Sequence, residues 1–82
     1  VVKAHAAPWK VFPNPVGEKL MVKLPISGTA RLDLYDAAGR PVGSALCSGA
    51  IAEMDVQHLA AGLYVIEVSI GTMRHRERLV KQ

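Results

Sequence analysis

The chain has 82 residues, half of them hydrophobic, and a formal net charge of +3. A chain this short forms one domain at most, because it buries only about 60–65% of its unfolded surface. Its apolar content favours a folded globule over disorder. No run of about 18 apolar residues predicts a membrane-spanning helix, and the first residues do not resemble a secretory signal. The simplest interpretation is a piece of a longer protein.

The positive charge is concentrated at the end of the sequence. The last ten residues contain four basic side chains, Arg74, Arg76, Arg78 and Lys81, against the single acidic Glu77. The basic and acidic side chains of the first 72 residues balance. The basic character therefore belongs to the terminal segment and points to a function there.

The chain divides into a lead-in and one domain. Residues 1–8 have no periodicity and are interpreted as a linker, and residues 9–82 as the domain. Within the domain, short strand-like runs are separated by Gly- and Pro-containing breaks. We expect seven strands: Trp9–Phe12, Lys19–Leu24, Ala30–Tyr35, Pro41–Cys47, Glu53–Val56, Leu63–Ile70 and Met73–Val80. This spacing predicts an all-β fold, an Ig-like antiparallel β-sandwich.

Alternating apolar residues support these strands. A period of two with one apolar face is what a half-buried strand requires. The segment 63–70 has the strongest apolar face and is predicted to be a central strand. The predicted inward rows are Leu20, Val22 and Leu24, then Ala30, Leu32 and Leu34, and finally Tyr64, Ile66, Val68 and Ile70.

The breaks have the chemistry of specific turns. Asp36 and Gly39 bound a predicted type I turn in which Asp36 bonds back to the backbone and Gly39 is left-handed. Gly71-Thr72 predicts a type II′ hairpin that joins the last two strands. Pro13-Asn14-Pro15 predicts an extended and then turned path.

A tyrosine corner is one of two interpretations of Leu59, Gly62 and Tyr64. In Greek-key sandwiches, such a tyrosine hydroxyl bonds an upstream backbone group. In the other interpretation, Tyr64 is only a large core residue.

Three segments, in this order, resemble one family. They are Val11-Phe12-Pro13-Asn14-Pro15, the hairpin from Leu32 to Val42 around Asp36 and Gly39, and the stretch from Asp55 to Val68 around Leu59, Gly62 and Tyr64. The ending Arg78-Leu79-Val80-Lys81 matches the usual terminus of the same family. Together they resemble the type A C-terminal sorting domain (Por secretion tail) of type IX secretion cargo in Bacteroidetes-type bacteria.

This resemblance implies an export signal and not an enzyme. It implies recognition by the outer-membrane type IX translocon and its carrier proteins, after transit through the periplasm. In the family, a sortase-like cysteine peptidase typically removes the domain and attaches the cargo to anionic lipopolysaccharide at the cell surface. In some components of the secretion machinery itself the domain is retained, and the resemblance leaves both outcomes open. Cleavage in the family falls upstream of the folded part, which corresponds here to residues 1–8.

The terminal strand is the predicted recognition site. In an extended strand, Arg74, Arg76 and Arg78 lie on one face about 6.8 Å apart, a ladder suited to an acidic groove or to lipopolysaccharide phosphates. The other interpretation is a charged edge that prevents aggregation. Since the family's terminal residues are those that the machinery recognises, the resemblance favours recognition and adds Leu79, Val80 and Lys81 to the site.

A second hypothesis is strand pairing, in which residues 78–81 add to a sheet edge of the receptor. Removal of the last five residues would then abolish export without unfolding the domain. The small fold also predicts either a monomer or a dimer that exchanges its first strand or last hairpin.

Other functions have little support in the sequence. His5, His58 and His75 lack ligand spacing, so no metal or other cofactor is expected. The single Cys47 excludes an internal disulfide and is interpreted as a small half-buried residue. No catalytic motif occurs, and no aromatic residues alternate with the basic strand as a nucleic-acid platform would require. The remaining alternative is an adhesion or carbohydrate-binding module. Such a module would have exposed aromatic residues over a concave face, but only Tyr35 is predicted to face outward.

Overall fold

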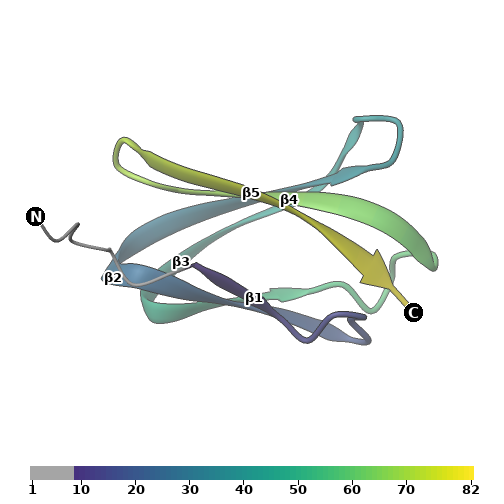
Figure 1. Cartoon of the computed structure of the whole chain (residues 1–82), viewed down its shortest axis with the longest axis horizontal. Coiled ribbons are helices and arrows are strands. Elements are labelled where there is room, and N and C mark those ends of the chain that lie inside the picture. The colour runs from purple at the N-terminus through teal and green to yellow at the C-terminus, as the bar shows by residue number, and fades with distance from the viewer. Residues whose placement is uncertain (1–8) are drawn as a thin grey trace, which may run out of the picture.

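A computed structural model describes residues 9–82 of the chain, without the side chains of residues 25–27. The fold is all-β (Figure 1). The strands are β1 (Lys10–Phe12), β2 (Lys19–Asp36), β3 (Pro41–Asp55), β4 (Gly62–Ile70) and β5 (Met73–Lys81). They form one antiparallel sheet in the order β1-β2-β4-β5, with β3 also paired to β2. The described residues contain no helix long and apolar enough to cross a membrane.

The prediction of seven strands was wrong in number. The expected strands 19–24 and 30–35 are parts of the 18-residue β2. The expected strand 41–47 and all of 53–56 except Val56 lie in the 15-residue β3. Glycine-containing breaks that we interpreted as chain reversals are bends within paired strands. The predicted Ig-like sandwich of separate sheets is accordingly replaced by one sheet that folds back over itself.

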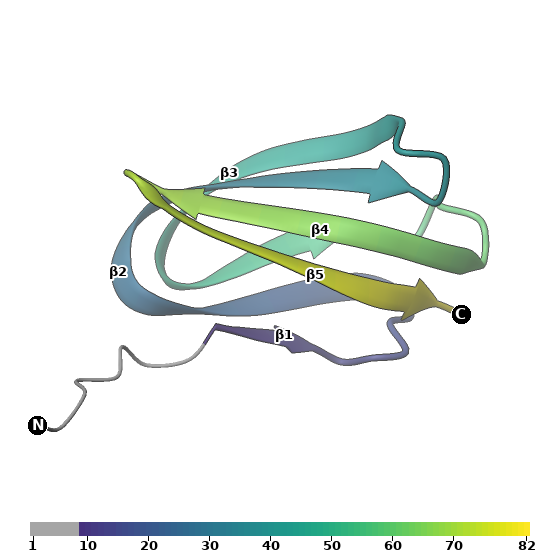
Figure 2. The same ribbon diagram turned by 45° about the horizontal axis from the view of Figure 1, so that its top comes forward.

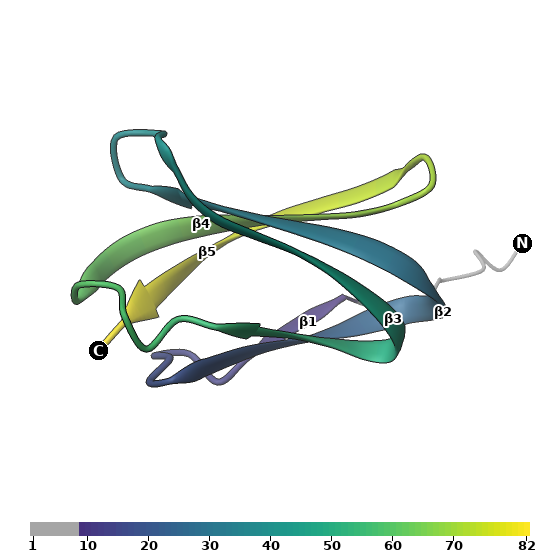
Figure 3. The same ribbon diagram turned by 180° about the vertical axis from the view of Figure 1, so that it is seen from behind.

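The bend lies where β2 and β3 change register. Their pairing is interrupted between Lys23 and Gly28 and resumes with Gly28 opposite Gly49. Glycine and irregular pairing favour a sharp change of direction in a strand. Figure 3 shows β2 and β3 turning together, so that the first half of β2 lies in one layer and its second half in the other.

The two layers enclose one hydrophobic core. The predicted inward rows are confirmed, since all ten of their side chains are buried. β4 lies between β2 and β5, as expected of a central strand. Six more buried residues from outside the predicted rows belong to this core: Val11, Val16, Ala52, Met54, Val56 and Leu79.

The sheet nearly closes on itself. Val16 forms a parallel bridge with Lys81, which joins the segment after β1 to the end of β5. Figure 2 shows β1 and β5 running in the same direction beside the remaining opening. There the Trp9 ring stacks on His75, with ring centroids 5.4 Å apart. Side-chain packing therefore replaces backbone pairing between β1 and most of β5.

Both predicted turns are confirmed. Asp36 Oδ1 accepts hydrogen bonds from the backbone N–H groups of Ala38 and Arg40, each at 2.9 Å, and Gly39 has a φ of 86°. Gly71 has a φ of 60°, and no non-glycine residue in the described chain has a positive φ. Only the first turn residue of the β4–β5 hairpin is therefore left-handed, as a type II′ turn requires.

The predicted tyrosine corner is also confirmed. The Tyr64 hydroxyl donates a 2.7 Å hydrogen bond to the carbonyl oxygen of Ala60. This bond ties the loop before β4 to the buried ring.

Replacing Tyr64 with Phe is expected to lower the free energy of unfolding by about 1 kcal/mol, because one hydrogen bond is lost while the ring stays. Urea denaturation measures the change. Tyr35→Phe is the matched control: the Tyr35 hydroxyl has no hydrogen-bond partner among residues 9–82, so its removal should change stability by less than about 0.5 kcal/mol. Equal effects of the two substitutions would show that the corner bond contributes nothing.

Candidate functional site

Residues on one face of β5 are buried or half-buried, and residues on its other face are exposed. Arg74, Arg76 and Arg78 are exposed on the outer face of the layer, as predicted. Leu79 and Lys81 alternate with them and are buried, with 1% and 8% of their surfaces exposed. The same strand therefore anchors in the core through one face and presents a basic ladder through the other.

The arginines differ in their neighbours. Arg76 Nη2 lies 3.6 Å from Glu67 Oε2 on the adjacent strand β4. For Arg74 and Arg78, the part of the chain from 9 to 82 offers no ion pair. Two of the three guanidinium groups are thus available to an external anion.

Nearby on the same layer, Arg31 of β2 forms an ion pair with Asp33, with Nε 3.0 Å from Oδ2. This hydrogen bond raises the pKa of Arg31 above its ordinary value. Both residues are satisfied within their own strand and add little to the charge of the ladder.

The Pro-Asn-Pro segment fixes the end of β5. Asn14 Oδ1 accepts a 3.0 Å hydrogen bond from the Val80 N–H. The Val16 N–H donates to the Val80 carbonyl at 2.8 Å, and the Gln82 N–H donates to the Val16 carbonyl at 2.9 Å. We call Asn14 and Val16, with these three hydrogen bonds, the clasp. It joins residues 66 positions apart in sequence.

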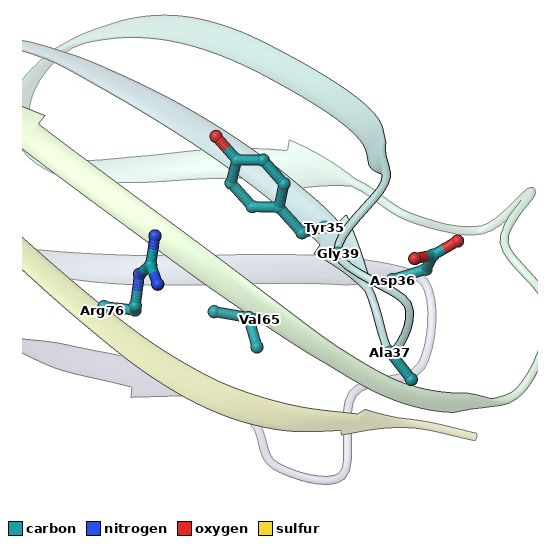
Figure 4. Close-up of a pocket in the computed structure, with 6 residues that line it drawn as sticks. All are labelled: Tyr35, Asp36, Ala37, Gly39, Val65 and Arg76. Atoms are coloured by element: carbon teal, nitrogen blue, oxygen red, sulfur yellow. The ribbon is translucent and has the colours of Figure 1, made fainter.

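A shallow hollow of about 300 Å³ lies on the same layer beside the ladder (Figure 4). Tyr35, Val65 and Arg76 line it, together with the turn around Asp36. None of the four aromatic side chains is fully exposed, however, since Trp9, Phe12 and Tyr35 are partly covered and Tyr64 is buried. A carbohydrate-binding face presents open aromatic rings, so this arrangement does not favour an adhesion module.

The family-motif residues predicted from sequence lie at three places. Pro13, Asn14 and Pro15 lie at the clasp. Asp36 and Gly39 form the β2–β3 turn, and Leu59, Gly62 and Tyr64 surround the tyrosine corner, where Leu59 packs against the core. Asn14 thus holds the end of β5, whereas the other two groups shape the β2–β3 turn and the loop before β4.

Sequence reasoning missed two contacts of this framework. It assigned Val16 to no element and gave no partner to Trp9. The Pro-Asn-Pro motif was the available signal for the first, but the pairing with Val80 depends on closure of the sheet, which no local pattern reveals.

His75 and Cys47 have contacts within the fold. Within residues 9–82, no three His, Cys, Asp or Glu side chains are grouped as metal ligands would be. His75 Nε2 contacts Glu77 Oε1 at 2.9 Å, and His5 lies outside the described residues. Cys47 is half-buried with its Sγ 3.4 Å from the Glu53 carbonyl oxygen, as expected of a small packing residue.

The Asp36 turn predicts a pH dependence. The backbone hydrogen bond from Arg40, supported by the Arg40 side chain and the Ala38 N–H, holds the pKa of Asp36 below its ordinary value of 3.8. A carboxyl whose pKa is depressed by folding contributes stability above its unfolded pKa and loses it as the pH falls through the folded pKa. Thermal melts of the native chain and Asp36→Asn should therefore differ at pH 7 and converge well below pH 3.8. A difference that persists unchanged in acid would contradict this origin.

The clasp predicts a localised effect of Asn14→Ala. Loss of the side-chain acceptor should cost about 1 kcal/mol of stability and should accelerate amide hydrogen exchange at Val80 first. Asn14→Asp retains an acceptor oxygen and is the matched control. Unchanged exchange at Val80 in the alanine variant would show that the clasp does not hold the strand.

Comparison with known proteins agrees with this geometry. The family described as a secretion system C-terminal sorting domain matches residues 10–82. A solved structure of PorZ, an essential bacterial surface component of the type-IX secretion system of Porphyromonas gingivalis, matches with a TM-score of 0.73 at 14% identity. The similarity covers 90% of this chain, which spans 11% of the PorZ chain. No curated protein matches. The match to the family extends over nearly the whole sequence, and the chain therefore belongs to the secretion system C-terminal sorting domains.

Proposed function

We propose that this domain is the export address of a longer protein, which it directs across the outer membrane through the type IX secretion system. The family match over residues 10–82 is the observation that carries the proposal. The cell surface or the outer membrane is then the destination of the attached protein. The domain itself acts by being recognised and not by catalysis.

The machinery is proposed to recognise β5. Arg74, Arg76, Arg78 and Val80 are exposed and form the contact surface. Leu79 and Lys81 act indirectly, because their buried side chains keep the strand in place. An acidic groove on a translocon or carrier protein complements such a ladder, since bidentate arginine–carboxylate pairs are strong and directional.

The later steps concern the segment before the fold. Residues 1–8 are the proposed cleavage region for a sortase-like cysteine peptidase, and they lie outside the described residues. The peptidase thiolate would attack a peptide carbonyl in this segment, with the domain leaving as the amine, and the resulting thioester would pass the cargo's acyl group to a nucleophile on anionic lipopolysaccharide. The similarity to a family whose members are sorting domains supports this order of events.

The first test is export of a reporter with a periplasmic signal at its start and residues 1–82 at its end. Surface display or release is expected in a bacterium with an intact type IX system, and periplasmic retention in a mutant without it. Retention of the folded fusion in both strains would contradict the sorting function. Mass spectrometry of the exported reporter locates the cleavage, which is expected within residues 1–8.

The second test reverses the charge of the ladder. Replacing Arg74, Arg76 and Arg78 with Glu should reduce export at least about tenfold, the effect of roughly 1.4 kcal/mol in a binding step. Replacing the exposed Lys10, Lys19 and Lys23 with Glu makes the same change of charge on the other layer and should leave export near normal. Equal losses in the two variants would indicate a dependence on net charge and not on β5.

Point substitutions test recognition more directly than removal of the last five residues, the test that the sequence suggested. That truncation removes Leu79, which is 1% exposed in the core, and the Val80 groups of the clasp. The shortened domain is therefore expected to lose stability, so a failure of its export would not isolate recognition. Loss of a buried leucine side chain alone costs about 2–5 kcal/mol, a large part of the stability of so small a domain.

A further inference from the structure

The outer edge of β5 has a free backbone over a defined stretch. Ile70 and Met73 flank the two-residue turn, so they form its hydrogen-bonded pair. From there the direction of the backbone groups alternates. The backbone N–H and carbonyl groups of four residues point toward β4, namely those of Met73, His75, Glu77 and Leu79. The backbone groups of the other four point away from β4, namely those of Arg74, Arg76, Arg78 and Val80.

The clasp confirms this alternation and limits the free stretch. The outward N–H and carbonyl of Val80 are both occupied, by Asn14 and Val16. Within the described chain, β5 has no strand neighbour other than β4 and the bridge at Lys81. Arg74, Arg76 and Arg78 thus present three N–H and three carbonyl groups along an edge that the fold leaves open.

The free backbone and the basic ladder coincide. In a strand, residues two apart share both the edge to which their backbone points and the face on which their side chains lie. A strand that pairs with this edge places alternate side chains directly opposite the three arginines. On its other face it places side chains near His75 and the Trp9 ring that stacks on it.

Charge selects the partner. Like charges opposite one another destabilise a strand pair, whereas opposite charges stabilise it. A second copy of β5 is therefore disfavoured, and a strand with acidic residues at alternate positions is favoured. The outer edge of β3 is also unpaired, but the exposed side chains of its first half, Ser44, Leu46 and Ser48, carry no charge and select no such partner.

We propose that residues 74–78 are a docking edge to which an extended, acidic peptide segment of a partner protein adds as a further β-strand. The segment has carboxylates at alternate positions facing the arginines and apolar residues between them facing Trp9. Residues 79–81, which the sequence indicated for strand pairing, are excluded because the clasp occupies their edge. The inference refines the recognition step of the proposed function and rests on it for the partner's identity.

The peptide acetyl-Thr-Glu-Val-Glu-Val-Glu-Thr-amide tests the proposal on the 82-residue chain. At low salt we expect a saturable change in fluorescence of Trp9, the only tryptophan. Amide hydrogen exchange should slow at Arg74, Arg76 and Arg78 and stay unchanged at His75 and Glu77, which already pair with β4. Absence of both responses would overturn the proposal.

Two controls separate strand addition from attraction of charges. A peptide N-methylated on the amides that face β5 keeps its carboxylates but cannot pair, so it should bind at least about tenfold more weakly. Arg74→Glu combined with Arg78→Glu should weaken binding of the parent peptide by about tenfold or more, with circular dichroism confirming the fold. Equal binding of the methylated peptide, or of the double variant, would overturn the docking edge.

The outcome is distinguishable from that of the export test. Normal type IX-dependent export of the reporter without peptide-induced amide protection refutes the docking edge and leaves the sorting function. Peptide binding with full protection, but without export of the reporter, supports the edge and refutes the sorting function.

Discussion

The continuous pairing of β2 with β3 is the constraint on which the rest of the fold depends. These two long strands bend together near Gly28 and Gly49, so one ladder contributes to both layers. Each half of β2 then accepts a different neighbour, β1 along its first half and β4 along its second. A domain of this size has room for only one thin core. Bending one sheet over itself lets the same strands supply both sides of the core.

The sheet nearly closes because the end of β5 pairs with the segment after β1. The position of β5 depends in turn on that pairing. Without Val16 and Asn14, the backbone at the end of β5 would pair only with β4. With them, Leu79 is held in the core and the arginines are kept in register on the outside. The motif at the start of the domain and the motif at its end are therefore one structural unit. The position of β5 therefore depends on residues at the start of the domain.

Local chemistry made much of the fold predictable. The alternation of Leu20, Val22 and Leu24 identified buried faces, and Asp36 with Gly39 identified a turn, because both depend only on neighbours in sequence. The strand count failed because a glycine that bends a paired strand and a glycine that reverses the chain have the same local pattern. The exposed positions of the arginines followed from alternation alone. The free backbone edge of these arginines could not be predicted in this way. Its extent is set by the contacts of Asn14 and Val16 with the end of β5, and these residues are distant in sequence.

The positions of the charged residues along β5 also explain how an edge strand can resist aggregation and still select one kind of partner. An open, uncharged edge pairs with any extended chain, including another copy of itself. Three arginines on the same residues that present free backbone groups make pairing between copies unfavourable, yet they leave the hydrogen-bonding groups accessible. Protection from aggregation and the proposed recognition of an acidic strand would then follow from one arrangement. The two interpretations of the basic ladder that the sequence leaves open are therefore compatible, because the charge that rejects one partner is the charge that selects the other.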